Sequence, residues 1–237
     1  MRLNARIFAK KIVCRCLATF ANMLDAAVEI QKRNDALASF NNVGPGCFIS
    51  SIDSIANPDN ISVGTNTFFG RLLRLSAIKD YHGRQYDGHI YIGSECSIFS
   101  YVYIGAAYCV TIGNHVTIAS RVTVLDHDHG IFIPDVSVMV QPLVGAPIHI
   151  GDYCWIGEGA VILKGVELGK GCIVGANAVV TQSYPNGSII GGVPAKIIGH
   201  REGYSTKTAS TNPIFPAIND TRPKSIRNTG INGNRHG

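Results

Sequence analysis

The densest group of titratable side chains in this chain is the run Asp126, His127, Asp128 and His129, in the segment LDHDHG. A histidine beside a carboxylate is typical of a general base, because imidazole titrates near neutral pH and a carboxylate can orient it. Two histidines one residue apart could instead ligate a metal ion, with a third histidine from another coil or subunit. A solvated turn is the third interpretation, and the run alone does not separate the three.

The scaffold that must position this run is indicated by apolar residues that recur about every six residues, a unit called here a hexad. Neither a strand nor a helix has that period, whereas a chain that lays down a short strand, turns and repeats does. Stacked turns of this kind bury one continuous core. The pattern predicts an all-β parallel β-helix with three hexads per coil. The fifteen hexad openers are Val43, Ile49, Ile55, Ile61, Ile92, Ile98, Ile104, Ile112, Ile118, Val124, Ile150, Ile156, Ile162, Leu168 and Val174.

The hexads lapse twice. Residues 68–91 are expected to hold an imperfect coil or a protruding loop, with 80–88 as the most turn-like part. The second lapse covers residues 126–148 and begins with the histidine run. Long excursions from a solenoid gather on one face and build a site there. The functional site is therefore expected at the second loop.

Charge divides the chain into three parts. Residues 41–200, the β-helix, carry eight Lys and Arg against eleven acids. Residues 1–40 carry seven against three, and residues 201–237 carry six against two. Because the body lacks a basic stripe, nucleic-acid binding is not expected. The segment 201–237 is polar and without a period, which predicts a disordered basic tail.

Residues 1–40 predict a basic amphipathic α-helix outside the repeat. Its apolar stripe consists of Val13, Leu17, Phe20, Leu24 and Val28. One interpretation is peripheral contact of residues 1–30 with an anionic membrane face. The other is a cap on the open end of the solenoid or a contact between subunits. Basic residues at positions 10, 11 and 15 interrupt any run long enough to span a membrane.

The seven cysteines do not form a disulfide pattern, since their number is odd and their spacing irregular. Cys47, Cys96, Cys154 and Cys172 occupy the fifth hexad position, where a small buried side chain is expected. Free cysteines favour a reducing compartment, and a cytoplasmic location is the corresponding prediction.

Three segments together resemble one enzyme family: VTVLDHDHG (122–130), IGDYCWIGEGAVILKGVELGKGCIVGANAVV (150–180) and GGVPAKIIG (191–199). They are similar to the hexapeptide-repeat acyltransferases, which include the galactoside, maltose and virginiamycin acetyltransferases. The segment SAIKDYHGRQYDGHIYIG (76–93) resembles in particular the O-acetyltransferases of bacterial lipopolysaccharide, capsule and exopolysaccharide. The resemblance spans residues 43–199. It implies a left-handed β-helix, a homotrimer with active sites between subunits, acetyl-CoA as donor and no metal.

The resemblance also implies residue roles. Alignment without gaps through the preceding hexad places the family's catalytic histidine on His129, as general base for direct transfer. His127 or Asp126 would then hold the imidazole tautomer. In several relatives an Asn thirty residues before the histidine contacts the acceptor. Here that position is Phe99, followed by Ser100, and these two are the expected acceptor contacts.

The donor site is expected on the last coils. Gly157 and Gly175 are separated by three hexads, as are Glu158 and Ala176, so each pair should stack at one corner. The family lays the pantetheine arm of the donor along this groove. Where the family often has Thr-Lys, this chain has Thr181 followed by Gln182, which leaves the CoA phosphates without that cation. Lys196 and Arg201 are the candidate replacements.

The expected function is therefore an acetyl-CoA-dependent O-acetyltransferase that modifies a hydroxyl of a bacterial surface-polysaccharide sugar (capsule, O-antigen or exopolysaccharide). It would act in the cytoplasm or peripherally at the inner membrane face. An amine acceptor would need the same base and groove. Two other classes stay open. One is a zinc-dependent, carbonic-anhydrase-like hexapeptide enzyme with ligands His115, His127 and His129, and the other is a non-catalytic trimeric scaffold.

Overall fold

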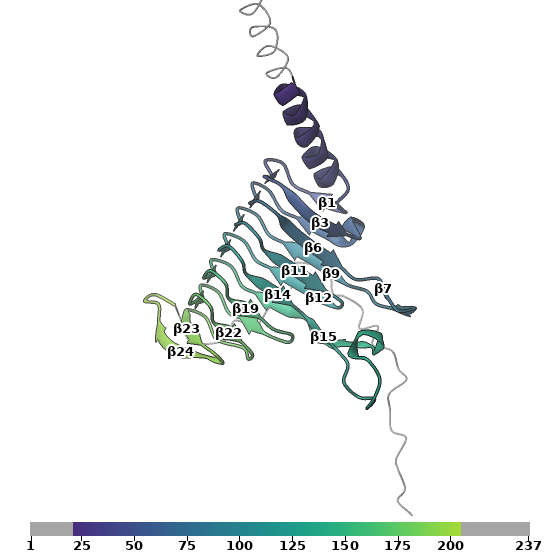
Figure 1. Ribbon diagram of the computed structural model, residues 1–237. Helices are drawn as coiled ribbons and strands as arrows, with labels where there is room; N and C mark the ends of the chain where they lie inside the picture. The colour runs from purple at the N-terminus through teal and green to yellow at the C-terminus, as the bar shows by residue number, and fades with distance from the viewer. Residues whose placement is uncertain (1–20, 205–237) are drawn as a thin grey trace, which may run out of the picture.

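The computed structural model describes residues 21–204, which form a left-handed parallel β-helix with one helix at its start (Figure 1). The predictions for residues 1–20 and for the tail beyond residue 204 lie outside the described residues. Three parallel sheets, here called A, B and C, run the length of the solenoid.

Each coil contributes one short strand to each sheet. Sheet A consists of β1 (Asn42–Val43), β4 (Ile61–Val63), β9 (His89–Ile92), β12 (Cys109–Ile112), β17 (Ile148–Ile150) and β20 (Glu167–Leu168). Sheet B consists of β2 (Phe48–Ile49), β5 (Phe68–Phe69), β10 (Ser97–Ile98), β13 (Thr117–Ile118), β18 (Trp155–Ile156), β21 (Ile173–Val174), β23 (Ser188–Gly192) and the antiparallel β24 (Ala195–His200). Sheet C consists of β3 (Ile52–Ala56), β6 (Leu73–Ala77), β11 (Tyr103–Ala106), β14 (Thr123–Leu125), β19 (Val161–Ile162) and β22 (Val179–Val180).

The hexad openers form the core, as predicted. Apart from Ile61, they stack in register along each sheet as one inward column, and nearly all of them are fully buried. In sheet B, for example, the column is Ile49, Phe69, Ile98, Ile118, Ile156, Val174 and Ile190. Burial of this continuous apolar column is the main term that holds the coils together.

The predicted coil length of three hexads is correct only for the last full coil, between Ile150 and Leu168. The earlier coils are all longer, as the register of sheet A shows along the column Val43, Val63, Ile92, Ile112 and Ile150. All of the additional residues lie between a sheet C strand and the next sheet A strand, a turn called here the C–A corner.

Ile61 was misplaced as an opener. Val63 is the residue in register with Val43, and Ile61 is an additional buried side chain that precedes it on the same strand. The two side chains lie on the same face of the strand, because successive side chains alternate between its faces. An insertion of two residues thus preserves the inward parity of a strand, which is why the core tolerates it.

Both excursions leave the solenoid at the C–A corner. The first is a hairpin of β7 (Asp80–Tyr81) and β8 (Arg84–Gln85), called here the buttress hairpin (residues 78–88). It is shorter than the expected loop at 68–91, because residues 68–77 complete strands β5 and β6. The second, called the histidine loop (residues 126–147), contains β15 (His127–His129) paired antiparallel with β16 (Leu143–Gly145). Short 3-10 turns η1 (Pro58–Asn60) and η2 (Val138–Val140) complete the elements.

The cysteines at the fifth hexad position serve packing. Each thiol donates a hydrogen bond to a carbonyl of the following coil, at 2.9 to 3.2 Å, and the four residues are Cys47, Cys96, Cys154 and Cys172. Three of them are buried and Cys47 is half-buried. The five cysteines among residues 21–204 form no disulfide. The prediction of small buried side chains at these positions is confirmed.

The described part of the N-terminal helix, residues 21–38, projects from the first coil in Figure 1. Its apolar residues Met23, Leu24, Val28 and Ile30 are exposed. Contact with the core comes at its end, where Phe40 is buried and Leu37 packs beside it. Within residues 21–204 no helix is long and apolar enough to cross a membrane.

Candidate functional site

Asp126 is the anchor of the histidine loop. Its side chain is fully buried, and its two carboxylate oxygens accept hydrogen bonds from the backbone N–H groups of Ala107 and Tyr108, each at 2.8 Å. His127 Nδ1 lies 2.8 Å from Asp126 Oδ1. Because a carboxylate can only accept, His127 Nδ1 carries the proton and donates it. Nε2 is then the ring nitrogen that this contact leaves outside.

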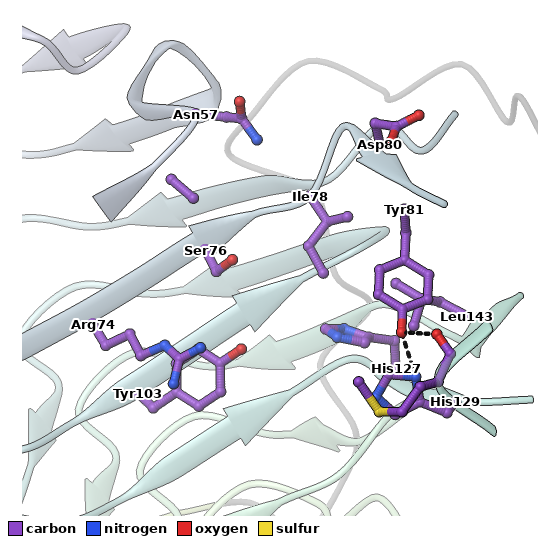
Figure 2. Close-up of a pocket in the computed structure, with 12 residues that line it drawn as sticks. Asn57, Arg74, Ser76, Ile78, Asp80, Tyr81, Tyr103, His127, His129 and Leu143 are labelled. Carbon is purple, nitrogen blue, oxygen red and sulfur yellow. Dashed lines mark hydrogen bonds between the residues drawn. The ribbon is translucent and has the colours of Figure 1, made fainter. Parts of the chain in front are cut away.

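His129 is held by a different partner. The hydroxyl of Tyr81, from the buttress hairpin, lies 3.2 Å from His129 Nδ1 and donates a hydrogen bond to the carbonyl of Met139. Figure 2 shows the Tyr81 hydroxyl between these two groups. Since the only hydroxyl proton is directed to Met139, the oxygen accepts from His129 Nδ1–H. His129, like His127, is therefore held through Nδ1, and Nε2 is the ring nitrogen that lies outside this contact.

Further contacts fix the histidine loop to its surroundings. The backbone N–H of Leu143 donates to the Tyr86 hydroxyl at 2.7 Å, a second contact from the buttress hairpin. Within the loop, the buried Gln141 side chain bonds the backbone of Ile133 and Val136 at 3.0 to 3.1 Å. Asp128, the second carboxylate of the run, forms an ion pair with Lys164 of the following coil rather than with a histidine. The loop is thus ordered by its own hydrogen bonds and by the hairpin.

Both histidines line a cavity of about 390 Å³ between sheet C, the buttress hairpin and the histidine loop (Figure 2). This volume lies in the range of small-ligand sites, about 300 to 1,000 Å³. Its floor comes from the outward faces of β3, β6 and β11, and its wall from the hairpin and the loop. The twelve lining residues are Ala56, Asn57, Arg74, Ser76, Ile78, Asp80, Tyr81, Tyr103, His127, His129, Met139 and Leu143.

The residues expected to bind the donor lie at the turn between sheets B and C, called the B–C corner, on the last coils. Gly157 N donates to Val174 O at 2.8 Å, and Asn177 N donates to Glu158 O at 2.8 Å, so the expected stacking of these positions is confirmed. A Cβ on Gly157 would lie 2.7 Å from the backbone N of Ala176, so glycine is required there by the adjacent coil itself. Glu158 forms an ion pair with Arg121, a residue that the sequence analysis did not single out.

The two candidate cations differ in their surroundings. Gly175 N donates to Ile190 O at 2.8 Å, and the next residue, Gly191, pairs with Lys196 across β23 and β24. Lys196 therefore continues the stack of Gly157 and Gly175, and its side chain is exposed. The guanidinium of Arg201 instead donates through one nitrogen to the carbonyls of Tyr153 and Gly171, at 3.3 and 3.0 Å. Thr181 is exposed and follows β22, so it lies at the C–A corner, whereas Gly175 lies at the B–C corner.

Phe99 and Ser100 do not line the cavity. They lie at the B–C corner of an N-terminal coil, where the Phe99 ring contacts that of Phe68 at 6.3 Å between centroids. Ser100 Oγ accepts a hydrogen bond from the backbone N–H of Arg71 at 3.1 Å. Within one chain, the structure therefore brings Asp126, His127 and His129 together without Phe99 and Ser100.

The three histidines of the zinc alternative do not come together either. His115 Nδ1 lies 3.2 Å from Glu95, and the His115 ring stacks on Tyr153 at 4.7 Å, away from the histidine loop. In the part of the chain that the structure describes, no group of three His, Cys, Asp or Glu side chains is arranged to hold a metal ion.

Tyr81 and Tyr86, which hold the histidine loop, were not predicted from the sequence, and neither was the Arg74–Tyr103 pair on the cavity floor. Both tyrosines lie where the hexads lapse, so no repeat position predicts the direction of their side chains. A usable signal was the number of aromatic residues in the segment DYHGRQYDGHIY, which is unusual for a solvated turn.

Comparisons with known proteins identify the same repeat and fold. Residues 147–182 match the family model described as bacterial transferase hexapeptide (six repeats). The chain is 38% identical over 151 residues to the putative lipopolysaccharide biosynthesis O-acetyl transferase WbbJ of Escherichia coli K12, covering 61% of this chain and 74% of that protein. It is 28% identical over 142 residues to a probable acetyltransferase of Mycobacterium tuberculosis, covering 60% of this chain and 47% of that protein.

Solved structures show the same architecture. A mutant of AntD, an N-acyltransferase from Bacillus cereus, in complex with dTDP and coenzyme A, superposes with a TM-score of 0.57 at 25% identity, covering 70% of this chain and 87% of that one. A second AntD mutant, in complex with dTDP-4-amino-4,6-dideoxyglucose and coenzyme A, gives a TM-score of 0.57 at 26% identity, covering 70% and 86%. The repeat, the fold and the extent of the WbbJ match together show that this chain belongs to the hexapeptide-repeat transferase family and is an acyltransferase.

Proposed function

We propose that the chain is an acetyl-CoA-dependent O-acetyltransferase that modifies a hydroxyl of a bacterial surface-polysaccharide sugar or of its precursor. The observation that carries the proposal is the cavity that presents two imidazoles, each oriented by a contact at Nδ1, beside the sheet. The named activity of the WbbJ relative supports an O-linked sugar acceptor. The coenzyme A in the AntD complexes supports a CoA thioester as donor.

His129 is the proposed general base. Its Nε2 takes the proton of the acceptor hydroxyl while the hydroxyl oxygen attacks the thioester carbonyl carbon. The tetrahedral oxyanion is stabilised by a backbone N–H. It collapses with cleavage of the C–S bond, and the imidazolium returns the proton to the departing thiolate. Tyr81 holds the tautomer of His129 through Nδ1, whereas Asp126 and His127 hold the start of the loop.

The arrangement separates donor from acceptor. The cavity opens on strands of the N-terminal coils, whereas Gly157, Glu158, Gly175 and Ala176 lie on the C-terminal coils. The histidine loop leaves the solenoid between these two regions. We therefore place the acceptor in the cavity and the pantetheine arm along the C-terminal B–C corner. Lys196, on β24 of sheet B, is the proposed partner of a CoA phosphate, whereas Thr181 follows β22 of sheet C.

A homotrimer would bring the donor corner of one subunit to the histidine loop of the next. The outer face of sheet B supports a contact between copies, because it exposes Phe48, Phe68 and Trp155, with Phe99 beside them. Such a contact would also bring Phe99 and Ser100 to a partner's site. We place the enzyme in the cytoplasm, where acetyl-CoA is made, with residues 1–30 as a proposed peripheral contact with the inner membrane face.

Two alternatives are each favoured by one observation. The 2.8 Å contact between Asp126 and His127 would also suit His127 as the base. AntD is an N-acyltransferase, and one of its two complexes contains an amino sugar, which favours an amine acceptor. Neither alternative changes the location of the site.

The test is thiol release from acetyl-CoA with a panel of free, nucleotide-linked and oligomeric sugars. Wild type is compared with His129→Ala, His127→Ala and the control His115→Ala, which alters a histidine outside the cavity. Loss of about 10²- to 10⁴-fold in His129→Ala, with His115→Ala unchanged, supports the proposal. Equal activity of His129→Ala and wild type excludes His129 as the base. Absence of thiol release with every acceptor, together with one zinc ion per chain, would favour the metal enzyme instead.

A further inference from the structure

The floor of the cavity carries one feature that acetyl transfer itself does not require. Arg74 on β6 and Tyr103 on β11 are register partners on the outward face of sheet C. The Arg74 guanidinium lies over the Tyr103 ring, with its central carbon 4.3 Å from the ring centroid. Contact of this kind holds a guanidinium in place while its N–H groups keep their capacity to donate.

The neighbouring positions on the floor are small. Further along the same strands, Ala56, Ser76 and Gly105 are in register. A Cβ on Gly105 would lie 3.0 Å from the Tyr103 hydroxyl and 2.6 Å from the Leu125 side chain, so the absence of a side chain makes room for the tyrosine ring. The tyrosine ring and Leu125 cover Gly105, whereas Ala56 and Ser76 line the recess between the Arg74–Tyr103 pair and the histidine loop. Figure 2 shows Arg74 and Tyr103 at one end of the cavity, His127 and His129 at the other, and Ser76 between them.

One cation, Arg74, and one carboxylate, Asp80, belong to the cavity lining. Among residues 21–204, no acidic side chain forms an ion pair with Arg74. The other charged group in the lining is Asp80, whose carboxylate accepts hydrogen bonds from Gly83 N at 3.3 Å and Gln85 Nε2 at 2.9 Å within the buttress hairpin. Arg74 is therefore the charged group of the lining that is available to a ligand.

We propose that Arg74, held over Tyr103, binds an anionic group of the acceptor and so selects acidic over neutral sugars. The anion is either the phosphate that links the sugar to its carrier or the carboxylate of a uronic acid, since a guanidinium pairs with both through two parallel hydrogen bonds. A sugar anchored in this way spans the recess and presents a hydroxyl to the histidine loop. The inference rests on the proposed function for the identity of the acceptor, although not for the existence of the anion site.

Turnover tests the selectivity. For each hexose that is acetylated, kcat/KM is compared among its methyl glycoside, its 1-phosphate and its uronate. Arg74→Gln should lower kcat/KM for one of the two acidic forms about 10- to 100-fold and for the methyl glycoside less than about twofold. Which acidic form responds distinguishes a carrier phosphate from a sugar carboxylate. Arg84→Gln is the matched control, because Arg84 is exposed on the same hairpin that walls the cavity and does not line it.

Two further measurements keep the inference separate from the proposed function. Arg74→Lys keeps the charge but loses the planar stack, and it should recover only part of the acidic preference. Calorimetric titration with glucose 1-phosphate, glucuronic acid and methyl glucoside needs no turnover. The wild-type protein could bind one of the acids, lose that binding in Arg74→Gln, and yet acetylate no acceptor. That result would support the anion site and contradict the proposed function. An unchanged acidic preference in Arg74→Gln, or no acidic preference in wild type by either method, overturns the inference.

Discussion

Asp126 Oδ1 and His127 Nδ1 are 2.8 Å apart, with the carboxylate fully buried and the imidazole side chain 11% exposed. The same carboxylate ties the start of the histidine loop to the backbone of Ala107 and Tyr108 in the preceding coil. One side chain thus fixes both the path of the loop and the tautomer of a histidine in the cavity. Its removal should therefore affect stability and catalysis together.

Asp126→Asn tests this double role. An amide has one acceptor oxygen, so at least one of the three donors around it would face an N–H₂ group and stay unpaired while buried. We expect a loss of about 2 to 4 kcal/mol in the free energy of unfolding and at least a tenfold loss of kcat. Denaturant unfolding and thiol-release kinetics measure the two effects.

Asp128→Asn is the matched control, because Asp128 is exposed and its partner is Lys164 at the surface. Its stability should change by less than about 1 kcal/mol. Equal losses of stability in Asp126→Asn and Asp128→Asn would show that the burial of the Asp126 carboxylate does not determine its contribution to stability.

Tyr81→Phe removes the hydroxyl that lies between His129 and Met139. The ring remains, so the hairpin should stay folded, but His129 loses the group that holds its Nδ1 proton. We expect kcat to fall about tenfold or more with little change in KM for acetyl-CoA and with a melting temperature within about 2 °C of wild type. Steady-state kinetics and thermal melting measure both. Tyr101→Phe, at an exposed tyrosine outside the cavity, should behave as wild type. A Tyr81→Phe enzyme with full kcat would remove the tyrosine from the mechanism.

The core and the loop histidines could be predicted from local sequence. The contacts that hold the histidines depend on segments outside the repeat. The hexads predict the core because each opener must turn inward to be buried. They misjudge coil length because an insertion of two residues preserves strand parity, as at Ile61 and Val63. The loop histidines are visible as a cluster, but the contact between Tyr81 and His129 joins residues 48 positions apart through a segment without a repeat.

The surroundings of Arg201 could not be predicted from the sequence for the same kind of reason. Sequence shows a cation near the donor corner, whereas only the packed structure shows that its guanidinium is engaged by the carbonyls of Tyr153 and Gly171. Lys196, inside the closing GGVPAKIIG motif, is left as the candidate for a CoA phosphate.

The glycine corner gives a prediction about stability. A Cβ on Gly157 would meet backbone atoms at 2.7 Å, whereas on Gly175 the nearest atom, Ile190 O, is 3.3 Å away. Gly157→Ala should therefore lower the free energy of unfolding by about 1 to 3 kcal/mol, and Gly175→Ala by less than about 1 kcal/mol. Thermal or denaturant unfolding of both variants measures the difference. Equal destabilisation would show that the coils adjust their spacing at this corner.

Two buried cysteines, Cys96 and Cys109, should be unreactive toward alkylating reagents in the native protein. Burial raises the pKa of both Cys96 and Cys109 to about 11. At pH 8 only about one thiol in a thousand would then be the reactive thiolate, and both side chains are also shielded from reagents. We expect iodoacetamide at pH 8 to leave Cys96 and Cys109 unmodified in the native protein while the half-buried Cys47 reacts. Peptide mass spectrometry identifies the labelled sites, and the same treatment in guanidinium chloride should label all three. Rapid labelling of Cys96 in the native state would mean that the coils open locally on the timescale of the assay.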